Sequence, residues 1–410
     1  MTVASLISGI VGADLPIAVR GWDGSSLGPA NAVATVEIRS PDALRRILFA
    51  PGELGFARAY VAGDIEVTGD LVAAIGLREV ITDVKVRPAH VLEALRLLGL
   101  RRLSPISPPA EEVRLRGRLH SFSRDAEAVS HHYDVSNRYY ELVLGPSMVY
   151  TCALFDRDDA TLEEAQEAKL DLVARKLALQ PGMRVLDIGC GWGSLAIHMA
   201  SRYNVRVVAV TIAAQQVERA QKRVAEAGLA HLVEVRLGDY REVDDGPYDA
   251  VSAIGILEHV GTDLPAYPAT VHRLLRPRGR FVHHAITRPA HRKPRTDGRT
   301  FLDRYVFPDA ELHEIGSIVT AMQDAGLEAW HMETLREHYV KTLGYWLKNM
   351  ETNWAECVAE IGLARAKIWK FFMAAGAQGF GANRIQIQQI LAVKPDGGRS
   401  GMPPHADWTR

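Results

Sequence analysis

Three glycines in the stretch VLDIGCGWGSLAIHMA, residues 185–200, have the spacing of a ligand-binding turn: Gly189, Gly191 and Gly193. They lie between a strand-like run and a helix-like run, where glycine lets the backbone turn sharply and approach a ligand closely. An NAD-type dinucleotide is disfavoured, because its fingerprint G-x-G-x-x-G/A requires glycine or alanine at Ser194 and an acid near Thr211. A purely structural turn stays open as the alternative.

Two carboxylates near this turn favour a different ligand. Asp187 ends the strand before the glycines, where it would anchor the loop, and Asp239 follows the third strand in LGDYR. A carboxylate at the second position can accept a hydrogen bond from an adenine amino group. This layout is typical of S-adenosylmethionine (SAM) methyltransferases, whose ligand lies at the carboxyl ends of the strands. The pattern therefore predicts a SAM site.

The elements that position these residues alternate between strand and helix. A capping-box pair, Thr161 and Glu164, begins a helix that ends before Pro181. Nearly continuous apolar runs then predict strands at 183–188, 205–210, 232–237, 248–255 and 279–286. Such runs indicate parallel strands buried on both faces. We predict an α/β, Rossmann-like methyltransferase fold: a mostly parallel, seven-stranded sheet with helices on both faces.

The first hundred residues have a different pattern, in which short strand-like runs at 16–19 and 35–39 alternate with helical ones. We expect a smaller N-terminal α+β domain over residues 1–103, associated with lipid or membrane. A proline-rich linker follows at 104–120. The methyltransferase domain is expected at 121–395 and a disordered tail at 396–410.

Composition excludes several classes of protein. The 410 residues carry a formal net charge of −1, which predicts no general attraction to nucleic acid. The three cysteines are far apart and favour neither disulfides nor a metal site, so we expect a reducing cytoplasm. The first basic residue is Arg20, the wrong order for a signal peptide, and no apolar run is long enough to span a bilayer.

Two basic stretches offer a membrane-surface contact. Residues 85–124 hold nine Lys or Arg against three acids, and residues 288–299 are also rich in Arg and Lys. Basic segments that carry leucines can lie on anionic lipid, but most charge runs are solvated linkers or helix faces. We expect the protein to lie at the inner face of the cell membrane.

Seven segments resemble the cyclopropane fatty acid synthase family, in its order and near its spacing. They are HHYDVSNRYYELVLGPSMVYTCALF, VLDIGCGWGSLA, VTIAAQQ, GILEHVG, HHAIT, RYVFP and HYVKTLGYW. The resemblance covers about residues 120–395. The segments LGPSMVYTCA, ITRP and GLARAKIWKFFMAAG are most similar to the tuberculostearic acid methyltransferase branch.

The resemblance implies methyl transfer from SAM to the cis double bond of a phospholipid acyl chain. In that branch the product is a 10-methylene chain, which a partner reductase saturates; a cyclopropane synthase closes a ring instead. The base would be a bound bicarbonate, and the positions that match its ligands are Cys152, Glu258, His284 and Tyr339, with the backbone of Ile286. Taken singly, each has an ordinary packing role as its alternative.

The resemblance also implies a SAM contact set beside the glycine turn: Tyr150, Thr151, Thr211, Gln216 and Asp239. Glu141 is a further candidate, to assist the proton loss that gives a methylene; a solvated helix carboxylate is the alternative. Aromatic residues that would face a carbocation, or simply pack, are Tyr133, Tyr305 and Phe307, and Trp192 would cover the cofactor or pack. The family implies a homodimer.

A protein of another class, which binds lipid without catalysis, would keep the fold and lose the chemistry. The presence of Cys152, Glu258, His284 and Tyr339 together argues against that interpretation.

Overall fold

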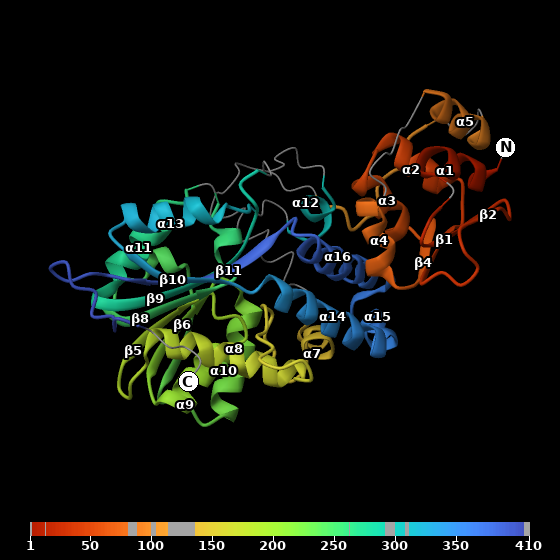
Figure 1. The fold of residues 1–410 in the computed structure, drawn as a ribbon. Helices are drawn as coiled ribbons and strands as arrows, with labels where there is room; N and C mark the ends of the chain where they lie inside the picture. Colours follow the sequence, from red (N-terminus) through yellow and green to blue (C-terminus); the bar gives the residue numbers. More distant parts are fainter. Residues whose placement is uncertain are drawn as a thin grey trace. The chain divides into compact units, whose positions relative to one another are not determined.

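The computed structural model describes residues 2–12, 14–80, 88–99, 104–113, 136–261, 263–291, 300–307 and 311–405. The chain forms two compact units, shown as a ribbon in Figure 1. The small unit comprises Met1–Arg114, Arg295–Pro308 and Trp354–Ala382. The large unit comprises Leu115–Pro294, Asp309–Asn353 and Asn383–Arg410.

The small unit combines a sheet with helices, as expected for an α+β domain. Its four described strands lie in the order β2-β1-β3-β4, with bounds Ser26–Leu27, Ala18–Gly21, Ala34–Ile38 and Ile65–Gly69. Its helices are α1 (Val3–Val11), α2 (Asp42–Phe49), α3 (Glu53–Val61), α4 (Leu71–Val80), α5 (Pro88–Leu98), α12 (Phe301–Tyr305), α15 (Trp354–Ile361) and α16 (Leu363–Gly381).

The two compact units differ from the expected domains in their boundaries. Helices α12 and α16 lie within the predicted methyltransferase domain, 121–395, but belong to the small unit. Phe371 on α16 explains why: its ring centroid is 6.0 Å from that of Phe56, 5.7 Å from Tyr60 and 4.7 Å from Phe301. The N-terminal segment buries its aromatic residues against a helix that comes more than three hundred residues later.

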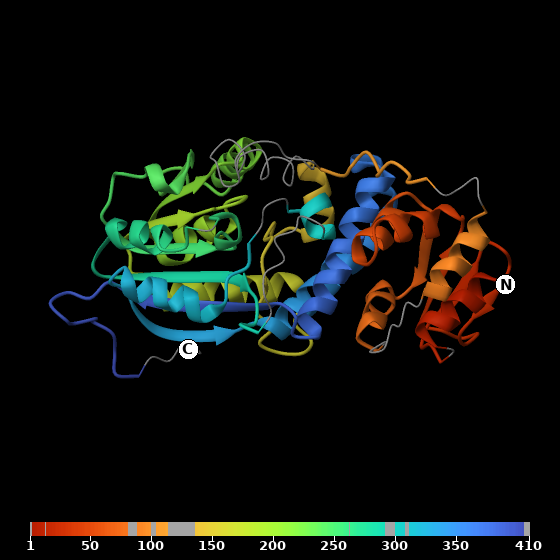
Figure 2. The same cartoon turned by 90° about the horizontal axis from the view of Figure 1, so that it is seen from above.

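The large unit contains the predicted seven-stranded sheet, in the order β10-β11-β9-β8-β5-β6-β7 across the described residues. The bounds in that order are Glu328–Thr334, Gln386–Val393, Leu275–Thr287, Tyr248–Ile254, Arg184–Ile188, Arg206–Thr211 and Val233–Leu237. Strands from β9 to β7 pair in parallel, and β11 runs antiparallel to both of its neighbours. Figure 2 shows this sheet from above. The expected fold class is confirmed.

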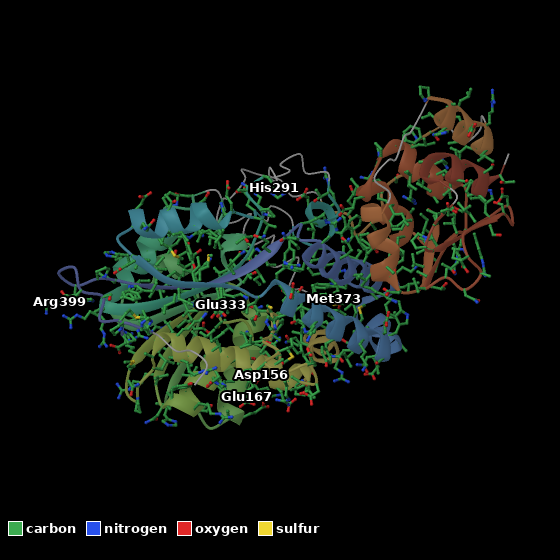
Figure 3. The ribbon with its side chains drawn as sticks, viewed as in Figure 1. Asp156, Glu167, His291, Glu333, Met373 and Arg399 are labelled. Carbon is green, nitrogen blue, oxygen red and sulfur yellow. The ribbon has the colours of Figure 1, made fainter. Side chains whose placement is uncertain are left out.

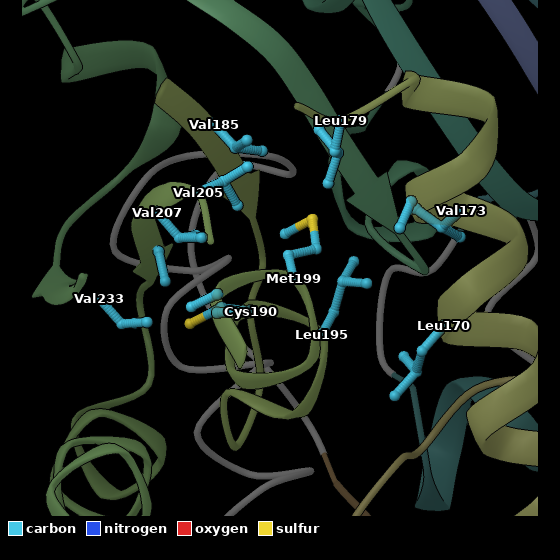
Figure 4. Packing of buried hydrophobic residues seen from close by; sticks show 14 of the residues in the cluster. Leu170, Val173, Leu179, Val185, Cys190, Leu195, Met199, Val205, Val207 and Val233 are labelled. Carbon is cyan, nitrogen blue, oxygen red and sulfur yellow. The ribbon is translucent and has the colours of Figure 1, made fainter. Parts of the chain in front are cut away.

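Helices cover the two faces of this sheet. One face packs against α8 (Leu162–Leu177), α9 (Ser194–Tyr203) and α10 (Ala214–Glu226), the other against α11 (Ala266–Leu274) and α13 (Ile315–Asp324). Figure 4 shows the first interface, where Val185 and Val207 of the strands meet Leu195 and Met199 of α9. Two further helices, α7 (Asn137–Leu144) and α14 (Arg336–Thr352), carry residues of the candidate site.

Strand alternation decides which side chains reach the α8 face. Val185 and Asp187 alternate with Leu186 and Ile188, which pack on the α11 face. Helix α8 begins at the predicted capping box, in which Thr161 and Glu164 bond each other's backbone N–H groups. The predicted helix and the five predicted strands are therefore present.

The expected disordered tail is wrong for its first part. Asp396 and Arg399 form a β-bridge, and Met402 packs against the hydrophobic cluster of the α8 face. Residues 406–410 lie outside the described residues. Among the described helices, none is long and apolar enough to cross a membrane.

Much of the two basic stretches also lies outside the described residues. Of their basic residues, the structure describes Arg96 in the first stretch and Arg288 in the second. The Arg288 guanidinium donates to Leu312 O at 3.0 Å and pairs with Glu314 at 3.4 Å. This arginine is engaged within the protein, so the lipid-facing hypothesis rests on the remaining residues of its stretch.

Candidate functional site

The glycine turn has the backbone that its sequence predicts. Gly189, Gly191 and Gly193 have φ angles of 72°, 55° and 80°, a region that disfavours residues with a Cβ. A Cβ on Gly189 would lie 1.7 Å from Ile256 Cδ1, whereas a Cβ on Gly191 would meet nothing within 4 Å. The turn is therefore packed at Gly189 and open at Gly191, which leaves room for a ligand against the backbone.

Asp187 lies on the α8 face at the end of β5 and is 2% exposed. Its Oδ1 accepts a hydrogen bond of 2.7 Å from Ser252 Oγ on β8, while Oδ2 has no partner among the described residues. Burial raises the pKa of Asp187 to about 7. The carboxylate thus accepts a hydrogen bond from the neighbouring strand β8. The sequence had instead predicted that it would anchor the loop after β5.

The residues expected to contact SAM after β6 and β7 already have partners. Thr211 Oγ1 donates to Gln216 Oε1 at 2.8 Å, and both side chains are buried. Asp239 accepts from the backbone N–H of Arg241 at 2.9 Å and from its guanidinium at 2.6 Å. Asp239 caps the short helix Tyr240–Glu242, so its predicted contact with adenine remains a proposal.

Tyr150 lies in a cluster of aromatic rings. Its ring centroid is 5.6 Å from that of Tyr140 and 5.2 Å from Trp346, and Trp346 in turn lies 6.0 Å from Tyr339. The ring of Trp192, in the glycine turn, is tilted against that of Tyr140 with the centroids 4.6 Å apart, and its indole N–H donates to Asn137. These rings form one connected cluster that includes Trp192 of the turn, and Trp346 is a member that the sequence did not predict.

Cys152 is fully buried beside Leu335, the residue that precedes α14. Its Sγ donates weakly to Leu335 O at 3.5 Å, and the next residue's N–H donates to Thr342 Oγ1 at 3.1 Å. Burial raises the pKa of the Cys152 thiol well above its usual value. The group is therefore a neutral thiol and not a thiolate nucleophile.

Glu258 follows β8 in the short helix Leu257–His259 and is 8% exposed. Its Oε1 accepts a 2.6 Å hydrogen bond from Ile286 N at the end of β9. Its Oε2 is buried with no hydrogen-bond partner among the described residues. Burial raises the pKa of Glu258 to about 7, so a proton on this carboxyl is accessible near neutrality.

His284 is fully buried on β9, on the same face as Asp187. Its Nδ1 lies 3.3 Å from Gln389 Nε2, and its Nε2 has no partner among the described residues. Burial and the nearby Lys169 charge lower the pKa of His284 well below the usual value. The imidazole is therefore neutral at physiological pH.

The contacts of these residues bring them to one edge of the sheet. Thr151 packs on Gly255, whose N–H donates to His284 O at 2.8 Å. Leu335 O, which accepts from Cys152, also accepts from Tyr339 N at 3.1 Å. Cys152, Glu258, His284 and the start of Tyr339's helix thus lie around the carboxyl ends of β8 and β9.

Lys169 on α8 is a site residue that sequence reasoning missed. It is 1% exposed, and its Nζ donates to Thr151 Oγ1 at 2.7 Å. Its charge acts on the pKa values of Cys152, Asp187 and His284, and burial lowers its own pKa to about 8. A signal was present, because Lys169 falls on the apolar face of its helix between Ala165 and Val173.

The other candidates contact residues outside this group. Glu141 accepts from Arg219 on α10 at 2.7 Å and is 30% exposed, which favours the alternative of a surface carboxylate. In the small unit, Tyr305 donates to Glu112 at 3.2 Å, and Phe307 packs against Phe372. Tyr133 lies outside the described residues.

Comparison with known proteins identifies the family of this chain. The model of the family described as mycolic acid cyclopropane synthetase matches residues 120–390. A probable fatty acid methyltransferase of Mycobacterium tuberculosis is 43% identical over 96% of this chain and 94% of its own length. The cyclopropane-fatty-acyl-phospholipid synthase of Escherichia coli K12 is 33% identical over 88% of each chain. A tuberculostearic acid methyltransferase of M. tuberculosis is 32% identical over 93% of this chain and 88% of its own.

Among solved structures, a mycolic acid cyclopropane synthase complexed with SAH and CTAB aligns with a TM-score of 0.62 and 31% identity. The alignment covers 65% of this chain and 97% of that one. The glycine turn, the sheet and these matches together show that the chain is a SAM-dependent methyltransferase and belongs to the mycolic acid cyclopropane synthetase family.

Proposed function

We propose that the protein transfers the methyl group of SAM to the cis double bond of unsaturated, oleoyl-type phospholipid acyl chains, giving a 10-methylene chain. Relatives described as fatty acid methyltransferases, as a phospholipid synthase and as a tuberculostearic acid methyltransferase support this substrate class. The glycine turn supports SAM as methyl donor, because it is open at Gly191.

One observation carries the proposal: Glu258 Oε2 and His284 Nε2 are buried near the ends of β8 and β9, and neither atom has a hydrogen-bond partner among the described residues. Buried polar groups are almost always hydrogen-bonded, so such atoms indicate a missing ligand. A protonated carboxyl and a neutral imidazole N–H are both donors, which suits an anion that accepts hydrogen bonds. Bicarbonate fits this donor set, with Cys152, Tyr339 and Ile286 N as its other neighbours.

The proposed reaction has three steps: methyl transfer, a hydride shift and the loss of a proton. The electron pair of the double bond forms a bond to the electrophilic methyl carbon that SAM supplies, the C–S bond breaks, and S-adenosylhomocysteine leaves. A carbocation then remains on the acyl chain. A hydride shift moves it to the methyl-bearing carbon, and loss of a proton from the added methyl gives the methylene. When bound, bicarbonate supplies the base for that proton.

The chain's own residues orient the acyl chain and stabilise the carbocation. A neutral alkene offers no proton for a base to remove before attack, so orientation and electrostatics supply the rate enhancement. The rings of Tyr150, Trp346 and Tyr339 line one wall, and an aromatic face stabilises a nearby cation. Cys152, Glu258 and His284 hold the base, and Thr151, fixed by Lys169, packs at the junction with β8.

Ring closure to a cyclopropane is the second candidate outcome. The same positions would serve it, and the family model and the aligned structure are described as cyclopropane synthases. The two reactions differ only in whether the hydride shifts before proton loss. The segments around Cys152 and after His284 that resemble the tuberculostearic acid branch favour the methylene.

We further propose that the small unit associates with lipid at the inner face of the cell membrane, that a partner reductase saturates the product, and that the enzyme is a homodimer. The basic stretches at 85–124 and 288–299, each of which has residues in both units, support membrane association of the protein. Liposome binding that survives both raised salt and neutralisation of these residues would contradict a role for the two basic stretches in that association.

Product analysis tests the central proposal. The protein is incubated with SAM and vesicles of oleoyl phospholipid, and the fatty acid methyl esters are isolated. A methylene chain and a cyclopropane chain have the same mass, so proton NMR must separate vinylidene from ring protons. Vinylidene protons support the methylene, ring protons establish the alternative, and no lipid-dependent turnover of SAM contradicts both.

A further inference from the structure

A row of polar side chains crosses the sheet next to the candidate site. Glu333 on β10 lies opposite Gln389 on β11, and Gln389 lies opposite His284 on β9. Paired residues on adjacent strands project to the same face. Lys176 of α8 reaches this row from the covering helix; Glu333 is labelled in Figure 3. The row extends from a partly exposed carboxylate to the buried imidazole.

The members of this row are joined by hydrogen bonds. Lys176 Nζ donates to the Glu333 carboxylate and, at 2.6 Å, to Gln389 Oε1. Gln389 Nε2 then lies 3.3 Å from His284 Nδ1. Lys176, Gln389 and His284 are each 0% exposed, so water does not compete for these positions. Burying a lysine is costly, and pairing with Glu333 offsets part of that cost.

The lysine decides which way the glutamine amide faces. An ammonium group has three donors and no acceptor, so only the amide oxygen of Gln389 can face Lys176. The amide nitrogen must then face His284. An amide nitrogen is only a donor, so His284 Nδ1 must be the acceptor and carries no proton. The orientation of the Gln389 amide therefore follows from the donor and acceptor chemistry of its two neighbours.

This orientation fixes the proton on the other nitrogen. A neutral imidazole carries one proton, so an accepting Nδ1 leaves that proton on Nε2. His284 Nε2 is the buried atom without a partner among the described residues. The row thus presents an N–H donor to the site, which suits an oxygen acceptor and would repel a cation.

We propose that Lys176 and Gln389 are positioning residues that lock His284 in its Nε2–H tautomer. The proposal rests on the proposed function, because it gives the N–H a role in holding the anionic base. Reversal of the tautomer would place a lone pair where the anion binds. In other enzymes that position a catalytic histidine through a neighbouring residue, the wrong tautomer costs on the order of 10⁴-fold in turnover.

Nitrogen NMR tests the tautomer without any turnover. The protein is labelled with ¹⁵N-histidine and two-bond correlations are recorded at pH 8, with the His284 signals assigned by their loss in His284→Gln. We expect a protonated Nε2 and an unprotonated Nδ1. A protonated Nδ1 in the wild-type protein overturns the inference, whatever the activity.

The matched variants are Gln389→Glu and Gln388→Glu. A carboxylate at 389 stays paired with Lys176 and offers only acceptors, so it demands the proton on His284 Nδ1. Gln388 lies one residue away on the opposite face of the sheet, where its amide oxygen accepts from Thr287 and its amide nitrogen donates to Gln386. We expect Gln389→Glu to invert the tautomer and lower kcat at least about 100-fold with the KM for SAM unchanged. We expect Gln388→Glu to keep the wild-type tautomer of His284 and the wild-type kcat.

Each outcome decides a separate point. An inverted tautomer with normal kcat overturns the positioning role, and equal loss in both variants makes the effect merely structural and overturns it as well. If Gln389→Glu does not fold, Lys176→Met removes the donor that orients the amide, and a wild-type spectrum in that variant contradicts the lock. A protein that never turns over SAM with lipid, yet shows the Nε2–H tautomer, refutes the proposed function alone.

Discussion

At the scale of single residues, the site is held together by groups whose charge is suppressed. Glu258, Asp187 and His284 are buried, and burial moves the pKa of each toward its neutral form. Such groups act by hydrogen bonding rather than as free charges. This suits a reaction whose intermediate is a cation, because a base can be held close to it by neutral donors.

Glu258→Gln should increase stability above neutral pH relative to wild type. Burial raises the pKa of the Glu258 carboxyl to about 7 from its ordinary value of 4.5, so the native state binds the proton more tightly than the unfolded state. Its contribution to stability is complete below pH 4.5 and is lost as pH rises through 7. The shift corresponds to about 3 kcal/mol.

Urea denaturation at pH 5 and pH 8 measures this difference. Relative to wild type, Glu258→Gln should gain about 2–3 kcal/mol of unfolding free energy on going from pH 5 to pH 8. Glu337→Gln is the control, because Glu337 is 84% exposed and pairs only at the surface. Parallel pH curves for wild type and Glu258→Gln would contradict the assigned burial of the carboxylate.

Glu141→Gln separates the two interpretations of Glu141. Because its carboxylate pairs with Arg219 at 2.7 Å, we expect the variant to keep the product ratio and to lose no more than about 1 kcal/mol of stability. The assay is the NMR product analysis together with urea denaturation. A fall in the methylene fraction would instead support its role in proton loss.

At the scale of elements, the glycine turn connects β5 to α9 and offers its backbone to SAM. Gly189 and Gly191 share a positive φ, but only Gly189 is packed, against Ile256. The two positions therefore separate the structural and the ligand-binding functions of one motif.

Gly189→Ala should destabilise the fold more than Gly191→Ala. Both substitutions force alanine into a left-handed conformation, at about 1–2 kcal/mol, but the first also overlaps Ile256 and adds about 1–3 kcal/mol. Gly191→Ala should fold and weaken SAM binding at least about tenfold, because its methyl points into open space. Urea denaturation measures the loss of stability, and calorimetric titration measures the affinity for SAM. Equal stability losses, or unchanged SAM affinity in Gly191→Ala, would contradict this division.

Much of the large unit was predictable from local pattern, and the polar site was only partly so. Apolar runs define the strands, and the capping box at Thr161 defines the start of α8, because these depend on neighbours in sequence. Lys169, Lys176 and Gln389 escaped prediction, since their roles depend on contacts between α8, β9 and β11. Two lysines on the buried face of one helix were the available signal.

At the scale of the whole molecule, the small unit is assembled from three separated segments. Hydrophobic pattern in the first hundred residues gave no indication that α16 completes it, because the partners of Phe371 are distant in sequence. Lys367 of the same helix pairs with Glu66 of β4 at 2.5 Å. The expected boundary after residue 103 therefore divides a single packed unit.

Phe371→Ala should destabilise the small unit by about 3–5 kcal/mol, because it leaves a cavity among three aromatic rings. Hydrogen exchange should accelerate in α3 while the amides of β5 stay protected. Leu363→Ala serves as the control, since Leu363 lies on the same helix and is 53% exposed. Unchanged exchange in α3 would show that α16 does not support the N-terminal segment.

The central claim is that the site adds a methyl group to a double bond and then removes one of its protons. It is tested most directly with SAM that carries a fully deuterated methyl group, followed by mass spectrometry of the acyl chains. The account predicts that each product chain retains two of the three deuterons, in either the methylene or the cyclopropane product. Chains that retain all three deuterons, or no labelled chains from the wild-type enzyme, would contradict it.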